Sequence, residues 1–346
     1  MTGQFNVLLT SVGRRSYLVK YFKEALQNNG KVYVSNSSIY SPAFVFADDY
    51  IITPLIYDND YIPFLIDYCK NKNIKLVVPL FDIDIYMLSK NKSIFEKNGI
   101  NVIVSDVETI EVCNDKWKMV NFLKQNGFDV PNTYIELNCC FNDLKNKKLN
   151  FPVMIKPRWG MGSIGIYQAD NFDELNVFYQ KTKKDIEKSY LKYESNQDIE
   201  HSVILQEKIV GQEYGLDIIN NLSANYKNTI VKKKLAMRAG ETDCAVVENN
   251  KILKNFGKEL SSKTNHIANL DVDLIVSNTG IYILDLNARF GGGYPFSHMA
   301  GINLPKAIIE WNKNNDFNEN VQEKSWNIVL HKNLEMIKLD FIERGE

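Results

Sequence analysis

Short apolar runs alternate with segments of helical spacing over the first hundred residues. Strands that alternate with helices form a parallel sheet with helices on both faces, and ligands of such sheets bind beyond the carboxyl ends of the strands. The pattern therefore predicts an α/β domain over residues 1–110. We expect strands at 5–10, 31–35, 76–80 and 102–105, and helices at 15–27, 62–70 and 84–98.

The organisation changes beyond residue 110. Asp115 is a predicted N-cap for a helix at 116–126, and from residue 202 onward the strand-like runs are closely spaced. Close spacing is typical of antiparallel strands, so residues 111–346 are expected to form a separate α+β unit. Its strands are expected at 151–156, 165–167, 203–207, 214–219, 229–235, 267–276 and 281–286, with a helix after Glu248.

Composition and charge exclude several classes of protein. The 346 residues carry a formal net charge of −1, whereas a nucleic-acid-binding protein would show a basic excess or stripe. No apolar stretch reaches the roughly 18 residues of a membrane span, and the five cysteines lack Cys-x-x-Cys spacing. We therefore expect a cytoplasmic protein with neither nucleic acid nor a membrane as partner.

A carboxylate and a carboxamide alternate along one strand-like run. Asp285 and Asn287 are two residues apart, so an extended strand points both to one face, which Arg289 shares. Asp273 lies on the preceding strand, joined to them by a turn at 278–280. Three oxygen donors beside an arginine suit a hard cation and a phosphoryl group. A half-exposed hairpin with solvated acids explains this segment equally well.

Two further segments have the composition of a nucleotide site. Lys156 ends an apolar strand and is followed by a glycine-rich loop over 160–165, in which backbone amides can approach phosphate oxygens. Between Glu207 and Glu213 a short linker exposes backbone groups that can read an adenine edge. The alternatives are an ordinary glycine-rich hairpin and a polar turn between strands.

Candidate substrate residues follow the first and third expected strands. Arg14 and Arg15 begin a helix, where free backbone amides favour an anionic group. Asp82 and Asp84 follow a strand and are candidates for a substrate amine or for a helix cap. The run that begins with Gly291 and Gly292 follows Arg289 and forms either the floor of an acceptor site or a tight turn before a helix near Pro305.

Taken together and in order, these motifs resemble the ATP-grasp superfamily. The resemblance runs from Asn114-Asp115-Lys116 through Lys156 and its loop and the 206–209 hinge to Asp285-x-Asn287-x-Arg289. It covers residues 110–310, and its pattern is similar to carbamoyl-phosphate-synthase-like and amino-acid-ligase-like members. It implies a pre-ATP-grasp domain over 1–110 and an ATP-grasp domain over 111–346, with a lid subdomain at about 128–205 and a catalytic core at about 206–320.

The resemblance also implies roles for individual residues. ATP would contact Lys116, Lys156, Gly160, Met161, Gly162, Ser163, Gly165, Glu207, Lys208, Ile209 and Glu213. Asp273, Asp285 and Asn287 would ligate magnesium, usually two ions, with Mn²⁺ as a substitute. Arg289, Arg238 and Lys156 would act on the reacting carboxylate and phosphoryl group.

The activity implied is ATP-dependent ligation of a carboxylate to an amine. The carboxylate would take the γ-phosphoryl group, ADP would leave, and an amine would displace phosphate from the acyl phosphate to give an amide. Expected partners are a small acid, such as an amino acid or a sugar-linked acid, an amine, and a second copy in a homodimer. Two alternatives are a small-molecule kinase or acyl-phosphate-forming enzyme, and a nucleotide-binding regulatory module without turnover.

Overall fold

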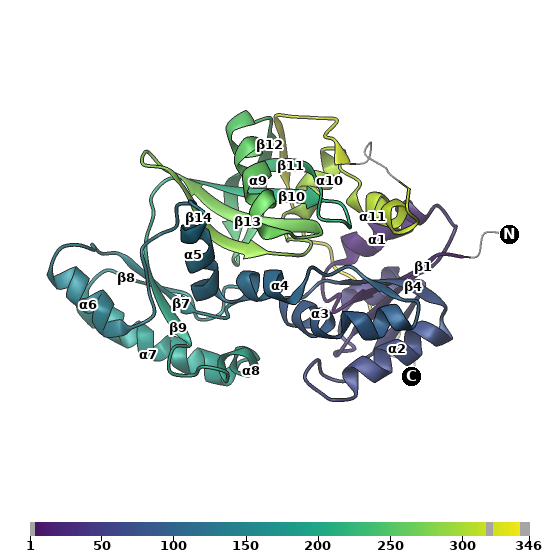
Figure 1. Ribbon diagram of the computed structural model, residues 1–346, viewed down its shortest axis with the longest axis horizontal. Helices are drawn as coiled ribbons and strands as arrows, with labels where there is room; N and C mark the ends of the chain where they lie inside the picture. The colour runs from purple at the N-terminus through teal and green to yellow at the C-terminus, as the bar shows by residue number, and fades with distance from the viewer. Residues whose placement is uncertain (1–3, 316–320, 340–346) are drawn as a thin grey trace.

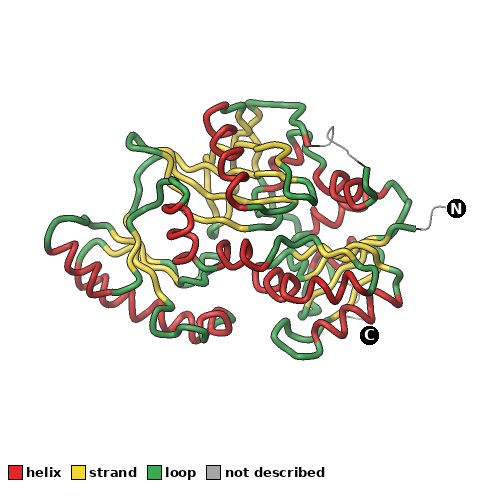
Figure 2. The backbone as a smooth tube through the Cα atoms, viewed as in Figure 1, coloured by secondary structure: helices red, strands yellow, loops and turns green. Residues whose placement is uncertain are grey.

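Five parallel strands form the sheet of the N-terminal domain. The computed structural model describes residues 4–315 and 321–339, and within it the strands lie in the order β3-β2-β1-β4-β5. All five residues of β1 are buried, because helices cover both faces of the sheet (Figure 2). The predicted parallel α/β unit is confirmed. Its strands are β1 (Asn6–Thr10), β2 (Val32–Asn36), β3 (Asp49–Ile52), β4 (Ile74–Pro79) and β5 (Asn101–Val102).

The helices of this domain follow the predicted periodicity with small shifts. The apolar face of the first helix is buried, which confirms the expected amphipathic segment. The strand β3 was not predicted, and β5 is shorter than expected. The helices are α1 (Ser16–Leu26), the 3-10 helix η1 (Pro42–Phe46), α2 (Tyr61–Asn71) and α3 (Asp82–Lys97).

A six-stranded antiparallel sheet forms the centre of the second part of the chain, which we call the core. Its order is β14-β13-β10-β11-β12-β15, and it lies above the N-terminal sheet in Figure 1. β12 was missed in the sequence because its first three residues are polar and exposed or half-buried. The strands are β10 (Gln212–Asn220), β11 (Tyr226–Arg238), β12 (Glu241–Glu248), β13 (Ala268–Val276), β14 (Ile281–Asn287) and β15 (Ile328–His331).

Five helices belong to the core or connect it to its neighbours. The predicted cap Asp115 is confirmed, since its carboxylate accepts hydrogen bonds from the amides of Trp117 and Lys118. These helices are α4 (Val107–Asn114), α5 (Lys116–Gln125), α9 (Lys251–Thr264), α10 (Tyr294–Met299) and α11 (Leu304–Asn312).

A third lobe projects from the core at the left of Figure 1, and we call it the lid. It is a four-stranded antiparallel sheet, ordered β6-β9-β7-β8, with its own apolar core. Its strands are β6 (Thr133–Tyr134), β7 (Val153–Pro157), β8 (Tyr167–Ala169) and β9 (Val203–Glu207), and its helices are α6 (Leu137–Lys145), α7 (Phe172–Lys188) and α8 (Leu191–Ser195).

The N-terminal domain and the core share one apolar cluster. Buried side chains of β1 and α1 pack together with those of α10 and α11. The ring of Phe22 meets that of Phe290 edge to face with centroids 6.1 Å apart. A shared cluster of this kind fixes the two domains relative to each other, so a site between them has stable walls.

The lid touches the N-terminal domain through four aromatic side chains and one carboxyl group, which we call the lid contact: Tyr57, Phe81, Tyr190, Tyr193 and Glu194. Tyr57 stacks on Tyr193 with centroids 4.2 Å apart, and its hydroxyl donates to Glu194 at 3.2 Å. Phe81 meets Tyr190 edge to face at 5.6 Å. The carboxyl of Glu194 is buried, and burial raises its pKa. The lid is therefore held against the N-terminal domain at a specific point.

We predict that Tyr57→Ala loosens the lid. The substitution removes the stacked ring and leaves the buried Glu194 without its donor, at a cost of about 1–3 kcal/mol. Hydrogen exchange of residues 189–198 should become faster, while Tyr57→Phe, which keeps the ring, should show a smaller effect. Tyr134→Phe is the control, because Tyr134 bonds Asp143 within the lid. Unchanged exchange in Tyr57→Ala would contradict the role of the contact.

Candidate active site

Four polar side chains lie on one face of the hairpin of β13 and β14. Asp273 lies opposite Asp285, and Asp271 lies opposite Asn287. Residues two apart in a strand share a face, so the three predicted oxygen donors are brought together. Asp271 was not predicted as part of this set, although its spacing from Asp273 indicates it.

Three lysines surround the two facing carboxylates. Lys116 Nζ lies 2.6 Å from an oxygen of Asp285, and Lys234 Nζ lies 2.5 Å from an oxygen of Asp273. Burial, followed by the charge of Lys116, lowers the pKa of Lys156 to about 8, while the two aspartates act in the opposite direction. Lys234 was missed in the sequence. Three lysine amines and two carboxylates together leave an excess of positive charge, which favours binding of a polyphosphate.

The oxygen donors of the hairpin fit magnesium. Residues 4–315 and 321–339 contain no group of three or more His, Cys, Asp and Glu that could hold a metal ion. The predicted set has two carboxylates and one amide, Asp273, Asp285 and Asn287. Mg²⁺ is usually held by one or two carboxylates and completes its shell with water and substrate phosphates. These donors are therefore suited to an ion that arrives with a nucleotide.

Arg289 connects the core to the N-terminal domain. Its Nε donates to Asp82 Oδ1 at 2.7 Å, and its Nη1 lies 3.7 Å from a carboxylate oxygen of Asp271. Burial raises the pKa of Asp271 to about 7. The negative charge of Asp273 acts in the same direction, and the positive charge of Lys232 acts against it. The guanidinium is thus oriented by acids from two domains. No partner for its Nη2 occurs in the described part of the chain.

Asp84 lies apart from Asp82 in spite of their close spacing. Its carboxylate is fully buried and accepts hydrogen bonds from the hydroxyls of Thr10, Ser11 and Tyr61, at 2.5, 2.8 and 2.6 Å. These bonds tie the loops after β1 and β4 together. Neither acid caps α3 with its side chain, and the cap position is occupied by Phe81.

The glycine loop lies between β7 and β8 and reaches the β11–β12 hairpin. Gly162 and Gly165 adopt φ values of +63° and +68°, which side chains rarely tolerate. A Cβ on Gly240, in the turn of the hairpin, would lie 2.0 Å from Ser163 Oγ. Arg238 precedes this turn, is exposed, and pairs with Asp243 at 3.0 Å. The loop and the hairpin that carries Arg238 therefore meet at their tips.

The hinge between β9 and β10 has two charged ends. Glu207 accepts hydrogen bonds from Asn132, at 2.8 Å from its side-chain amide. Lys208 is exposed and donates to Gln168 at 2.7 Å, and Ile209 is half-buried. Glu213 lies 3.9 Å from Lys234. Glu213 thus connects the hinge to the lysine and carboxylate cluster.

The glycine run after Arg289 is enforced by its neighbours. A Cβ on Gly291 would lie 2.1 Å from the carboxyl carbon of Asp271, and one on Gly292 would lie 3.4 Å from Glu241. The run leads into α10, a helix that precedes the one expected near Pro305. A side chain at Gly291 would therefore collide with Asp271, so this glycine is required for the close approach of the carboxyl group.

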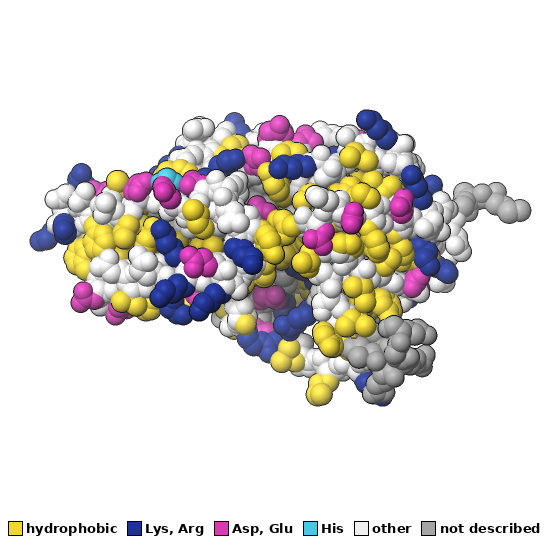
Figure 3. Space-filling model, turned by 90° about the horizontal axis from the view of Figure 1, so that it is seen from below, with side chains coloured by type: hydrophobic (Ala, Val, Ile, Leu, Met, Phe, Trp, Pro, Cys, Tyr) yellow, Lys and Arg dark blue, Asp and Glu magenta, His cyan; other side chains and the backbone are white. Residues whose placement is uncertain are grey.

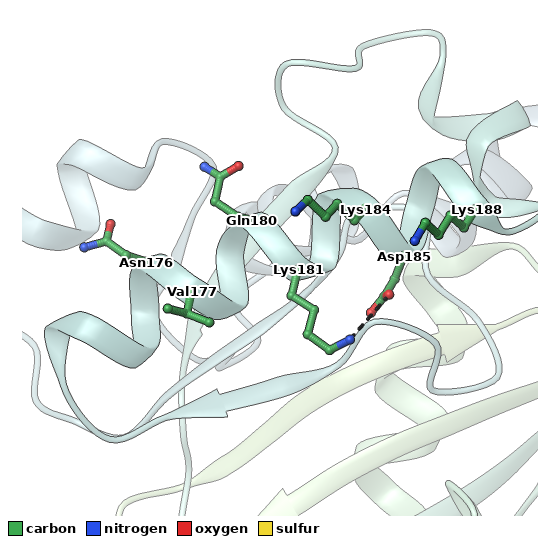
Figure 4. A pocket seen from close by; sticks show the side chains of 7 residues that line it. All are labelled: Asn176, Val177, Gln180, Lys181, Lys184, Asp185 and Lys188. Carbon is green, nitrogen blue, oxygen red and sulfur yellow. Dashed lines mark ion pairs between the residues drawn. The ribbon is translucent and has the colours of Figure 1, made fainter.

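The underside of the molecule is hollowed near the centre of Figure 3, where acidic and basic side chains lie in a recess. A second, open hollow lies on α7 in the lid (Figure 4). All its lining residues belong to that one helix: Asn176, Val177, Gln180, Lys181, Lys184, Asp185 and Lys188. It contains none of the candidate residues, so it does not bear on the chemistry.

Comparisons with known proteins identify both parts of the chain. Residues 7–103 match the PylC-like N-terminal domain, and residues 113–293, more than half of the chain, match an ATP-grasp domain. An uncharacterized protein of Methanocaldococcus jannaschii is 26% identical over 287 residues, which is 80% of this chain and 68% of that protein. The large chain of carbamoyl phosphate synthase of Pseudothermotoga lettingae is 22% identical over 231 residues, which is 62% of this chain and only 19% of that protein.

Solved structures share the fold. The ADP complex of PurK, an N5-carboxyaminoimidazole ribonucleotide synthetase, superposes with a TM-score of 0.70 at 15% identity, covering 95% of this chain and 81% of that one. The L-amino acid ligase of Bacillus licheniformis gives 0.67 at 18% identity, covering 89% and 75%. The biotin carboxylase domain of Hydrogenobacter thermophilus 2-oxoglutarate carboxylase gives 0.72 at 14%, covering 92% and 73%. The predicted two-part architecture is confirmed.

We predict that Lys156→Met stabilises the ligand-free protein at pH 7. The folded pKa of about 8 lies below the ordinary 10.5, so below pH 8 the folded state pays for a charge that water solvates better in the unfolded chain. The penalty is about 1–3 kcal/mol. Between about pH 8 and 10.5 the unfolded chain binds the extra proton, so wild-type stability rises with pH and the difference shrinks.

Urea denaturation at pH 7 and at pH 10 measures this difference. Lys184→Met, at an exposed position of α7, is the matched control and should show no comparable change. A Lys156→Met protein less stable than wild type at pH 7 would contradict the prediction, as would a difference that does not depend on pH.

Proposed function

The chain belongs to the ATP-grasp family, and we propose that it is an ATP-dependent carboxylate–amine ligase that releases ADP and phosphate. The observation that carries this proposal is the facing pair of Asp273 and Asp285, each matched by a lysine, with Arg289 at the end of the same hairpin. This cluster concentrates positive charge around oxygen donors for magnesium. Transfer of a phosphoryl group depends mainly on such positioning and charge neutralisation.

In the proposed reaction, a carboxylate oxygen of the acid attacks the γ-phosphorus of ATP, and the bond from that phosphorus to the β–γ bridging oxygen breaks. The amine nitrogen then attacks the acyl carbon, phosphate leaves, and the nitrogen loses a proton to give the amide. Lys116 and Lys156 would hold phosphate oxygens, and binding of these anions would raise the lowered pKa of Lys156. When bound, Mg²⁺ would neutralise charge on the transferred group.

Arg289 is proposed to stabilise the transferred phosphoryl group and the acyl phosphate. Its orientation by Asp82 and Asp271 supports this role, because a fixed guanidinium does not have to reorganise during the reaction. Glu207, Lys208, Ile209 and Glu213 are proposed to hold the adenosine, and the loop 160–165 to cover the phosphates. Arg238 is proposed to join the site when its hairpin and the glycine loop close together.

The proposal is tested by ADP release from a panel of acids crossed with amines, followed by mass spectrometry of the products. An amide with stoichiometric ADP supports a ligase, whereas a stable phosphorylated product indicates a kinase or an acyl-phosphate-forming enzyme. Binding of ATP without turnover across the panel would favour a regulatory module.

We predict that Asp285→Ala and Asn287→Ala each lower substrate-dependent ADP release at least a hundredfold. Each removes an oxygen donor for magnesium, and losing one preorganised polar group that acts in the transition state costs about 3 kcal/mol or more. Asp106→Asn is the control, because Asp106 is exposed and makes no capping bond with its side chain. Near-normal turnover in both hairpin variants would refute the magnesium assignment.

A further inference from the structure

Arg15 stands at the topological switch point of the N-terminal sheet. β1 pairs with β2 on one side and with β4 on the other, so the chain direction around the sheet reverses there. In open parallel sheets a ligand crevice forms at this point, beyond the carboxyl ends of the strands. The loop after β1 carries Arg15 at this point of the sheet, and the connection after β4 carries Asp82.

The loop that carries Arg15 is held in place by hydrogen bonds. The amide of Gly13 donates to Asn36, its carbonyl accepts from the hydroxyl of Ser41 at 2.6 Å, and the amide of Arg15 donates to Val12 at 3.0 Å. The position of Arg15 is therefore set before a ligand binds, which lowers the entropic cost of binding.

The guanidinium of Arg15 has no counterion. Within residues 4–315 and 321–339 its side chain makes no hydrogen bond or ion pair, whereas those of the enclosed Arg158 and Arg289 do: Arg158 with Asp115 and Asp198, and Arg289 with Asp82. Protein atoms enclose the side chain although solvent still reaches it, and this burial lowers its pKa despite nearby Asp82 and Glu241. Arginine has five donors that match a carboxylate or phosphate, so an enclosed and unpaired one favours an anionic ligand.

The reaction itself limits which anion fits Arg15. Arg289, whose positive charge repels that of Arg15, is paired with Asp82 and lies at the reacting end of the hairpin. The attacking carboxylate loses its own charge when it becomes an acyl phosphate. An arginine that paired only with this carboxylate would lose part of its attraction as that charge disappears, so the contact would favour the ground state over the transition state. A group that keeps its negative charge throughout the reaction can stay paired with Arg15 in both the ground state and the transition state.

We propose that Arg15 binds a second anionic group of the acid substrate, a carboxylate or a phosphate that is not activated. This inference rests on the proposed function for the first carboxylate, and it specifies the substrate as an acid with two anionic ends. Arg15 thus determines specificity at the switch point, whereas Arg289 acts at the reacting end.

Matched pairs of acids test this inference by binding alone. Succinate and glutarate are compared with butyrate and valerate, and 3-phosphoglycerate with glycerate, in the presence of Mg²⁺ and a non-hydrolysable ATP analogue. We expect at least one dianion to bind wild type at least tenfold more tightly than its monoanionic match, as measured by calorimetry. The two arms separate a carboxylate anchor from a phosphate anchor.

Variants at Arg15 then show whether this preference arises there. Arg15→Ala should reduce the preference for the dianion at least tenfold, Arg15→Lys should keep part of it, and affinity for the ATP analogue should stay within twofold of wild type. Because Arg15 has no counterion in the described chain, Arg15→Ala should melt no lower than wild type. Lys20→Ala removes an exposed charge from the same helix and should preserve the preference.

Several outcomes would overturn the inference. The inference fails if wild type binds every dianion no more tightly than its monoanionic match, or if Arg15→Ala keeps the full preference for the dianion. It also fails if Arg14→Ala loses this preference while Arg15→Ala does not, or if Arg15→Ala is markedly less stable than wild type. Failure of the proposed function looks different: the dianion binds through Arg15, but no acid and amine pair yields ADP and an amide.

Discussion

The ion pair between Arg289 and Asp82 joins the two halves of the candidate site. Arg289 follows β14 of the hairpin, and Asp82 follows β4 of the N-terminal sheet. The Nε of Arg289 lies 2.7 Å from Oδ1 of Asp82. Buried charges persist in proteins when they are paired, so this contact fixes the distance between the switch point and the hairpin. A substrate that enters at the switch point therefore meets the phosphoryl-transfer residues in a defined position.

In the ligand-free protein, the two aspartates of the hairpin form ion pairs with lysines of neighbouring elements. Lys116 pairs with Asp285 and Lys234 with Asp273, which leaves the charge of Lys156 without an acid of its own. Arrival of MgATP would exchange these partners, because the metal takes the carboxylates and the phosphates take the lysines. For Lys116, Lys234 and the two aspartates, such an exchange costs less desolvation than binding to bare charges, since each of these four groups already has a counterion close by.

Much of this arrangement follows from local sequence patterns, and the rest depends on tertiary contacts. Alternation of two residues along β14 was enough to place Asp285 and Asn287 together, and periodicity predicted α1. Lys234 was not predicted as a site residue, because the direction of a side chain on β11 depends on which face of the sheet is covered. The pairing of Arg289 with Asp82 spans 207 positions, and no local pattern encodes it.

The loop after β4 connects all three parts of the molecule. Phe81 meets Tyr190 of the lid, and the next residue, Asp82, pairs with Arg289 of the core. Both contacts therefore depend on the position of the same short strand-to-helix connection, whose backbone has only two soft dihedrals per residue. A shift of this connection would therefore change both the ring contact with the lid and the ion pair with the core.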